Sequence, residues 1–325
     1  MKTITILVLE TAVPAAIVDP RYMFSAVNEF FKSSGHQPFF KIQLASVNKQ
    51  VKLLDGSLII KPDIILKDIK KTDLVIIPAI SGDIKIALKK NKEIIEWIKQ
   101  QYKKGAEVAS LCIGAFVLAS TGLLNGKMCS THWLFANDFK TMFPEVKLVD
   151  DKVVTDQNGL YSSGGASSYW SLLLYIVEKY TSRDMAIMAS KFFMLDISLK
   201  SQAPFMLFRG QKEHNDSEVK SIQRYIEENY GKKLTVGDLV TKNGIGRRTL
   251  ERRFKKATSN SVIEYIQRVR VEAAKKMLEV DRKNVTEVMY AVGYSDNKAF
   301  RDIFKKITDM SPVDYRLKYS KQIIK

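Results

Sequence analysis

Short apolar runs alternate with amphipathic segments through residues 1–201. Runs rich in β-branched residues, such as residues 73–78, are typical of strands buried on both faces of a sheet. Strands that alternate with helices predict a parallel sheet with helices on both faces, in which ligands bind at the carboxyl ends of the strands. The predicted strands are residues 3–9, 39–44, 73–78, 106–111 and 161–163, and the predicted helices are residues 22–32, 93–102, 114–121, 167–180 and 183–193.

From residue 217 to about residue 316 the pattern is helical throughout, and part of it occurs twice. A segment of the form Phe-Lys-Lys-x-Thr, followed by Ser and by an acidic residue with Tyr, begins at Phe254 and again at Phe304. Two copies in one register imply two copies of one supersecondary unit. Each copy contains a short amphipathic helix, a turn with Gly and a second, basic helix, which is the helix-turn-helix pattern. The predicted elements are residues 236–242, 243–246 and 247–257 in the first copy, and residues 285–292, 293–295 and 296–307 in the second.

The residues between the alternating and the helical patterns are predicted to be a linker. Pro204 and Gly210 interrupt regular structure, and Asp216 is placed to cap the helix that follows. We therefore expect an α/β domain at residues 1–201, a linker at residues 202–216 and an all-α domain at residues 217–325. In the all-α domain a long helix at residues 262–278 joins the two helix-turn-helix units.

Charge adds to this picture mainly in the last third of the chain. The whole chain has 52 Lys and Arg against 35 Asp and Glu, a net charge of +17. Residues 214–325 alone hold 25 basic and 15 acidic residues, so this smaller part carries +10 of the excess. Such a field suits a polyanion, of which nucleic acid is the usual one. A basic surface that only aids solubility is the alternative, and the repeated helix-turn-helix pattern favours nucleic acid.

The remaining composition argues against several classes of protein. Two cysteines, Cys112 and Cys129, make no disulfide framework and fit a reducing cytoplasm. The uncharged residues 108–126 are about as long as a membrane span, but their Ser, Thr and Gly content favours a strand, a turn and a buried helix. Three widely separated histidines predict no metal site, and the lack of a Gly-rich phosphate loop predicts no nucleotide cofactor.

Cys112 stands where one predicted strand ends and a helix begins. A thiol on such a sharp turn has the geometry of a nucleophile elbow. The helix dipole and the free N–H groups of the helix are expected to favour the thiolate over the thiol. The alternative is an inert, small, buried residue at a tight turn.

The first domain resembles the PfpI/ThiJ superfamily over roughly residues 3–200, with the closest likeness to its regulator branch and to isocyanide hydratases. This resemblance implies a class I glutamine-amidotransferase-like fold. The residues that carry it are residues 112–119, 122–126, 131–133 and 163–165.

The resemblance implies a ligand pocket near Cys112 without turnover, or a dimerisation role. Peptidase-like members have His directly after the cysteine, where this chain has Ile113, and Trp170 stands where the family often has Asp. The domain is therefore predicted not to be an enzyme. The alternative is a hydratase- or amidase-like enzyme that uses Cys112 with Asp19 and carries a DNA-binding appendage. The candidate pocket residues are Glu10, Asp19, Cys112, Ile113, His132 and Gly165.

The second domain resembles the AraC/XylS family of bacterial transcription activators over about residues 217–317. The resemblance implies that both helix-turn-helix units face one side of the DNA, in major-groove segments one helical turn or about 34 Å apart. Gly246, Ser259 and Val262 depart from the Ser, Gly and Pro that the family usually has. The residues that carry the resemblance are residues 248–255, 268–274, 291–296, 300–306 and 311–316.

Each second helix has two apolar residues four positions apart, which are expected to face the core and leave the opposite face for DNA. Arg suits guanine, Asn suits adenine and carboxylates accept from cytosine, whereas Lys side chains contact phosphates. Arg253, Arg268 and Arg270 are instead expected to cover apolar surface or to pair with Glu272 or Asp281. The predicted DNA-binding residues are Arg247, Arg248, Glu251, Arg252, Lys255, Lys256, Asn297, Lys298, Arg301, Asp302, Lys305 and Lys306.

The sequence therefore predicts a cytoplasmic, sequence-specific DNA-binding transcription regulator that forms a homodimer. We expect an unidentified small molecule bound at the first domain to control it. Its other expected partners are double-stranded promoter DNA and, by family resemblance, RNA polymerase, with no membrane, metal or cofactor. A nonspecific nucleic-acid binder is a further alternative, with no preference among DNA sequences.

Overall fold

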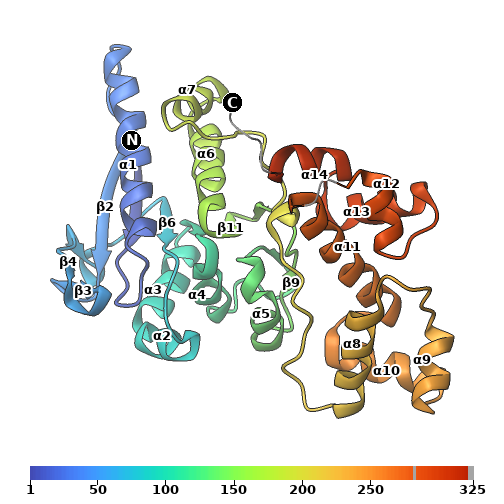
Figure 1. The fold of residues 1–325 in the computed structure, drawn as a ribbon. Helices are drawn as coiled ribbons and strands as arrows, with labels where there is room; N and C mark the ends of the chain where they lie inside the picture. The colour runs from blue at the N-terminus through green and yellow to red at the C-terminus, as the bar shows by residue number, and fades with distance from the viewer. Residues whose placement is uncertain (281–282, 321–325) are drawn as a thin grey trace. The chain divides into compact units, whose positions relative to one another are not determined.

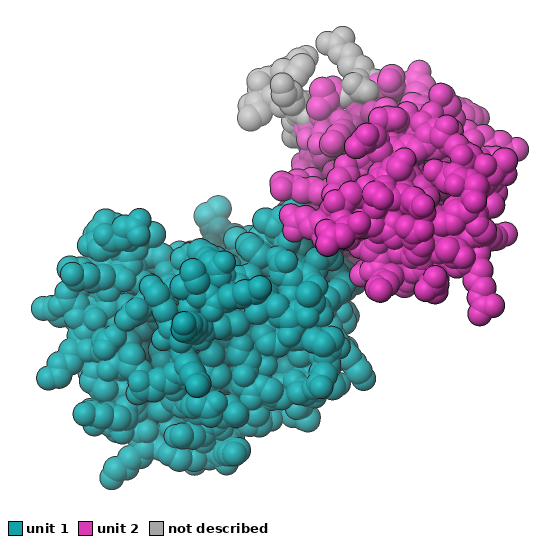
Figure 2. Space-filling view, turned by 90° about the horizontal axis from the view of Figure 1, so that it is seen from below, with its two compact units in different colours: residues 1–202 teal, residues 203–325 magenta. Residues whose placement is uncertain are grey.

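A computed structural model describes residues 1–280 and 283–320 of the chain, which forms two compact units. Unit 1 is Met1–Gln202 and unit 2 is Ala203–Lys325 (Figure 2). Each unit has its own hydrophobic core, and unit 2 has two.

Unit 1 is built on a seven-stranded sheet with the order β10-β11-β7-β6-β1-β2-β5 (Figure 1). Every neighbouring pair is parallel except β10 and β11, so the predicted parallel sheet is confirmed with one antiparallel edge. The four residues of β6 are all buried, as expected for an apolar central strand. The strands are β1 Lys2–Leu7, β2 Phe40–Ser46, β5 Ile64–Ile65, β6 Leu74–Ile77, β7 Glu107–Ser110, β10 Val154–Gln157 and β11 Leu160–Ser163.

The helices of unit 1 form two groups on the two faces of this sheet. Helix α1 packs with α6 and α7, and α4 packs with α2 and α3 (Figure 1). This arrangement confirms the predicted α/β fold with helices on both faces. The helices are α1 Ala15–Ser33, α2 Ile84–Lys90, α3 Lys92–Lys103, α4 Ala115–Ser120, α5 Ala136–Met142, α6 Tyr169–Tyr180 and α7 Arg183–Phe192.

Several small elements of unit 1 were not predicted from the sequence. Strand β10 is the instructive case, because the two residues between β10 and β11 are Asn158 and Gly159, with φ of 53° and 73°. An Asn-Gly pair of this kind is the usual signal of a tight hairpin, so the sequence did contain the information. The other unpredicted helices and strands are α2, α5, β5 and the paired strands β3 Val51–Leu53 with β4 Leu58–Ile60 and β8 Met128–Cys129 with β9 Lys147–Leu148.

All the regular secondary structure in the described residues of unit 2 is helical, and it confirms the two predicted helix-turn-helix units. Helices α9 and α10 form the first, helices α12 and α13 form the second, and α11 contributes residues to both cores. The helices are α8 Ser217–Asn229, α9 Val236–Asn243, α10 Arg247–Thr258, α11 Val262–Val280, α12 Val285–Ala291, α13 Asn297–Thr308 and α14 Pro312–Tyr319.

Residues 203–214, which we call the strap, belong to the part of the chain predicted as a linker, but they pack along unit 2. The Lys275 ammonium donates to the Met206 carbonyl, and the Glu272 carboxylate accepts from the Phe208 N–H at 3.1 Å. The Gln223 amide donates to the Gln211 carbonyl at 2.9 Å. Gln202, the other end of the predicted linker, makes its bonds inside unit 1. The strap is ordered because its apolar residues and carbonyls find partners on α8 and α11.

Phe304→Ala tests the independence of the two units. Phe304 is fully buried, so its truncation is expected to lower the stability of unit 2 by about 3–5 kcal/mol. All three tryptophans lie in unit 1, so tryptophan fluorescence reports the unfolding of that unit. In urea, the part of the helical circular dichroism that comes from unit 2 should be lost at a lower urea concentration in the variant than in wild type. The fluorescence change should occur at the same urea concentration in both proteins.

Leu317→Ala is the matched control, because Leu317 is 63% exposed and its truncation should change stability by no more than about 0.5 kcal/mol. Equal shifts of both signals in Phe304→Ala would contradict the two-core description.

Candidate nucleic-acid interface and cysteine site

Helix α10 is held in place by one apolar stripe. Leu250, Phe254 and Thr258 lie at intervals of four residues and are all fully buried. The Phe254 ring packs edge-to-face on Tyr265 of α11, with ring centroids 5.2 Å apart. As the sequence predicts, Gly246 provides no side-chain cap for α10.

Helix α13 repeats this construction. Phe300, Phe304 and Thr308 are buried, and the Phe304 ring packs edge-to-face on Tyr315, with centroids 5.5 Å apart. Asp296 caps the helix by accepting from the Ala299 N–H at 2.6 Å. In both helices, therefore, the same positions are buried, and a phenylalanine packs on a tyrosine ring.

Both helices also end in the same way. Thr258 and Thr308 each donate to the carbonyl of the residue four positions earlier, at 2.8 Å. The next residues, Ser259 and Asp309, have left-handed backbones with φ of 58° and 59°. A left-handed residue ends a helix sharply, so Ser259 adopts the conformation that the family's usual Gly would adopt. The replacement of the family's usual Gly by Ser259 therefore leaves this turn intact.

The opposite faces of α10 and α13 carry the predicted DNA-binding residues. Glu251 is half-buried rather than exposed, and the Lys255 ammonium lies 3.9 Å from the Glu264 carboxylate. Within residues 1–280 and 283–320, the other basic side chains on these faces have no ion-pair partner, which leaves them available to phosphates and bases. The exposed residues are Arg247, Arg248, Arg252, Lys255, Lys256, Asn297, Lys298, Arg301, Asp302, Lys305 and Lys306.

The three arginines expected to act within the fold do so: Arg268 covers an apolar ring as predicted, whereas Arg253 and Arg270 have partners that were not predicted. Arg253 binds the Asp216 carboxylate at 2.9 and 2.6 Å, and this hydrogen-bonded pair lowers the pKa of Asp216. The Arg268 guanidinium lies over the Phe208 ring, and Arg270 donates to two backbone carbonyls. The predicted acceptor Glu272 bonds to the strap and to Lys275 instead, and Asp281 lies outside the described residues.

Cys112 occupies the predicted sharp turn between β7 and α4. Its φ is 53°, a left-handed backbone that a residue other than Gly rarely adopts. The Cys112 N–H donates to the Ser163 hydroxyl at 3.0 Å, and the Thr131 hydroxyl donates to the Cys112 carbonyl at 3.2 Å. A Cβ on Gly114 would lie 2.5 Å from the Pro78 carbonyl oxygen, so only glycine allows this approach of strand and turn.

Burial favours the second interpretation of Cys112, a neutral buried thiol, over the thiolate. The residue is 5% exposed, and burial raises its pKa to about 11, which the Ile113 N–H only partly offsets. Desolvation penalises the charged form, and α4 is a short helix that begins three residues later. The thiol is therefore neutral at pH 7.

Asp19, one of the predicted pocket residues, is bound by Tyr169, which the sequence did not indicate. The Tyr169 hydroxyl donates to the Asp19 carboxylate at 2.5 Å, and burial and this bond raise the tyrosine pKa. The sequence drew attention to Trp170, whose ring packs on Phe193 at 5.2 Å.

The other predicted pocket residues are His132, Gly165, Ile113 and Glu10, and no hydrogen bond in the described residues joins them to Asp19 or Tyr169. The His132 ring lies beside Gly165, accepts from the Leu134 N–H at 3.1 Å and has a pKa lowered by burial, so it is neutral at pH 7. Ile113 is half-buried next to the cysteine. Glu10 is exposed and accepts from the Asn48 amide at 3.1 Å, in a shallow hollow that it lines with Gln50 and Lys52.

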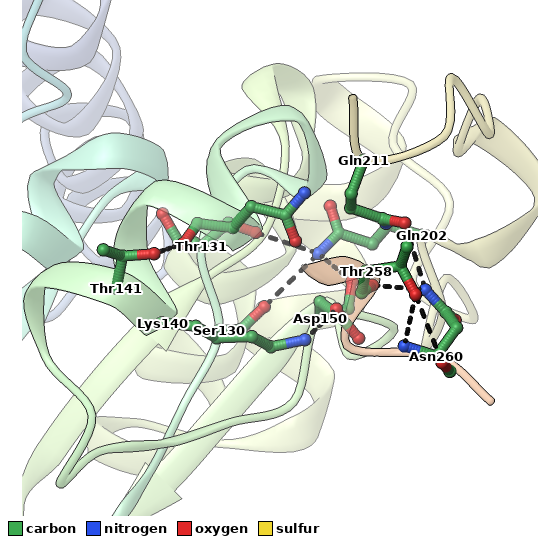
Figure 3. Close-up of polar contacts among 10 residues, drawn as sticks. Ser130, Thr131, Lys140, Thr141, Asp150, Gln202, Gln211, Thr258 and Asn260 are labelled. Carbon is green, nitrogen blue, oxygen red and sulfur yellow. Dashed lines mark hydrogen bonds and ion pairs between the residues drawn. The ribbon is translucent and has the colours of Figure 1, made fainter. Parts of the chain in front are cut away.

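The Gln202 side chain binds the turn at Gly165, which lies beside His132. Its Oε1 accepts from the Gly165 N–H at 2.9 Å. Its Nε2 donates to the carbonyls of Thr131 and Asp150 at 3.0 and 2.8 Å (Figure 3). A buried amide with this many partners holds the turn and the strand end next to it in one arrangement.

Comparison with known proteins matches each unit separately. The DJ-1/PfpI family profile matches residues 14–179, and a helix-turn-helix domain profile matches residues 239–318. This chain belongs to the DJ-1/PfpI family.

Relatives join such a domain to a DNA-binding domain. The HTH-type transcriptional regulator GbdR of Pseudomonas aeruginosa is 25% identical over 287 residues, which cover 87% of this chain and 76% of that protein. The regulator CdhR of the same organism is 21% identical and covers 85% of this chain and 82% of its own. A solved AraC family transcriptional regulator from Pseudomonas putida has a TM-score of 0.50 at 17% identity, covering 59% of this chain and 100% of its own.

The matches confirm both predicted resemblances and the prediction of a DNA-binding transcription regulator. The DJ-1/PfpI domain of this chain contains the turn at Cys112. The AraC-type domain contains α10 and α13, the second helices of the two helix-turn-helix units, which we call the recognition helices. In the part of the chain that the structure describes, no helix is long and apolar enough to cross a membrane.

Alkylation tests the neutral state of Cys112. A pKa of about 11 leaves about one thiol in ten thousand ionised at pH 7, against a few in a hundred for an ordinary cysteine. Iodoacetamide should therefore modify Cys112 in the native protein at least a hundredfold more slowly than in urea, with the rate rising about tenfold per pH unit from 7 to 9.

Peptide mass spectrometry separates Cys112 from Cys129, which is fully buried and serves as the internal slow reference. Rapid modification of native Cys112 that does not change with pH would show a thiolate and contradict this assignment.

Proposed function

We propose that α10 and α13 enter successive major-groove segments of one promoter duplex and give the regulator its sequence specificity. The observation that carries this proposal is the repeated construction of the two helices. Each buries its apolar stripe against an aromatic residue and exposes a face with Arg, Lys and polar side chains. Helices that present such faces bind base edges in the major groove.

The exposed residues divide by chemistry into two groups. Arg248, Arg252, Asn297 and Arg301 carry planar groups that match the edges of guanine or adenine, so we assign base contacts to them. The Lys pairs near the ends of the two helices are assigned to phosphates, which position the protein without specifying sequence. These pairs are Lys255 with Lys256 and Lys305 with Lys306.

We also propose that the DJ-1/PfpI domain binds a small molecule and does not catalyse a reaction. The neutral Cys112 thiol and the neutral His132 ring supply neither a nucleophile nor a strong base. The Asp19 carboxylate and the Tyr169 hydroxyl provide a pair of polar groups that suit a polar effector. The rival is an enzyme that uses Cys112 and Asp19, and it requires the thiolate that burial disfavours.

The chain between the two units suggests how an effector acts on DNA binding. Gln202 bonds to the turn next to His132, and four residues later Met206 bonds to Lys275 of α11. Each end of this segment is held by hydrogen bonds within its own unit. We propose this segment as the route by which an effector controls DNA binding.

Assembly and partners complete the proposal. Two copies on adjacent DNA sites bind with higher apparent affinity than one, so a homodimer is the proposed form. RNA polymerase is the proposed downstream partner, by the AraC/XylS resemblance. Both cysteines are free and buried, which fits action in a reducing cytoplasm.

Base-pair preferences test the assigned faces. An operator is first selected from random duplexes with the full chain, and binding is then measured to every single-base variant. Arg252→Ala and Arg301→Ala should each weaken binding by about 1–3 kcal/mol and remove the preference at particular base pairs. Lys256→Ala should weaken all sequences alike and reduce the salt slope by about one unit.

Arg253→Ala is the control on the same helix, because Arg253 is held by Asp216 and is not assigned to DNA. Unchanged selectivity in both Arg252→Ala and Arg301→Ala would show that these faces do not recognise sequence. Equal affinity of wild type for random DNA and for selected DNA would support a nonspecific binder instead.

A further inference from the structure

The two halves of unit 2 have separate hydrophobic cores. One core surrounds Leu250 and Phe254, and the other surrounds Phe300 and Phe304. Helix α11 passes from one core to the other, and Tyr230 packs against both. The orientation of α10 relative to α13 therefore depends on α11 and on any further contact between the two halves.

Arg270 provides the centre of that second contact. It lies on α11, and its Nε and Nη2 donate to the carbonyls of Tyr230 and Lys232 at 3.0 and 2.9 Å. These carbonyls belong to the chain just after α8, in the first half. The same guanidinium lies 5.2 Å from the ring centre of Tyr294, in the turn of the second half. One side chain thus joins both halves to the helix that connects them.

Two glycines allow the halves to meet at this point. A Cβ on Gly293, whose φ is +83°, would lie 2.7 Å from the Tyr230 carbonyl oxygen and 3.0 Å from Nη2 of Arg270. A Cβ on Gly231 would lie 2.8 Å from the Ala291 carbonyl oxygen. Real side chains essentially never come so close to backbone, so the backbones of the two turns are in direct contact only because both residues are glycine.

We infer that Arg270 is a positioning residue that fixes the separation and relative rotation of the two recognition helices. Its Nε and Nη2 donate to backbone carbonyls, and we assign it an effect on DNA binding through α10 and α13. The inference rests on the proposed function, in which both helices bind one duplex. On B-DNA an extra base pair between two half-sites increases their separation by about 3.4 Å and rotates one half-site by about 35° relative to the other. A rigid pair of helices does not tolerate this change, whereas a loosened pair does.

The test measures binding of the full chain to duplexes in which the spacer between the two selected half-sites has zero, one or two extra base pairs. Wild type should lose about tenfold or more in affinity for a duplex with either insertion, because only one helix can then stay in its groove. Arg270→Met should bind the unaltered operator about tenfold more weakly and lose less than about threefold on insertion.

Controls separate positioning from charge and from folding. Arg268→Met removes the same charge from a neighbouring position whose guanidinium lies over Phe208, and it should keep the wild-type spacing profile. Arg270→Lys keeps the charge but cannot bridge two carbonyls with a planar group, so it should lie between wild type and Arg270→Met. Should Arg270→Met lose native helical circular dichroism, Arg270→Lys carries the test.

A wild-type insertion profile in both Arg270 variants overturns the inference, even where their affinity is lower. The failure of wild type to prefer any operator would instead overturn the proposed function. The two failures are therefore distinguishable in one set of measurements.

Discussion

The structure of the DNA-binding unit depends on one repeated contact, a phenylalanine packed edge-to-face on a tyrosine. Phe254 meets Tyr265 and Phe304 meets Tyr315 with nearly the same separation, and the tyrosine hydroxyls donate to Glu227 and Glu279 at 2.7 Å. Each contact fixes which face of a recognition helix is buried. The exposed face then follows from helical geometry, because residues between the buried positions must point away.

Burial also decides the chemistry of the first domain. The turn at Cys112 has the strained backbone of an activated nucleophile, and the sequence predicted that geometry. Desolvation acts against the thiolate, however, and it outweighs the N–H group that favours it. The same domain contains the Tyr169–Asp19 hydrogen bond and the several hydrogen bonds of the Gln202 amide, which fix the local backbone and side-chain arrangement. Binding of a small molecule by this domain is the function that we propose for it.

The sequence predicted what depends on local pattern and missed what depends on distant partners. The buried strands, the recognition helices and their repeat follow from spacing, and most were predicted to within two residues of their bounds. Two-residue strands such as β5 and β8 carry no periodicity, so no pattern could identify them. Tyr169 meets Asp19 from 150 residues away, and Arg270 meets Tyr230 from 40 residues away. The sequence predicts a linker where the strap lies, because Pro204 and Gly210 interrupt regular structure there and its partners on α8 and α11 are distant in sequence.

Both recognition helices are proposed to bind the same duplex at once. Hydroxyl-radical footprinting of the full chain on its selected operator measures this directly. Two protected segments per bound copy are expected, on one face of the DNA and about 10 base pairs apart. A single protected segment per bound copy would show that only one helix enters a groove and would contradict the proposal.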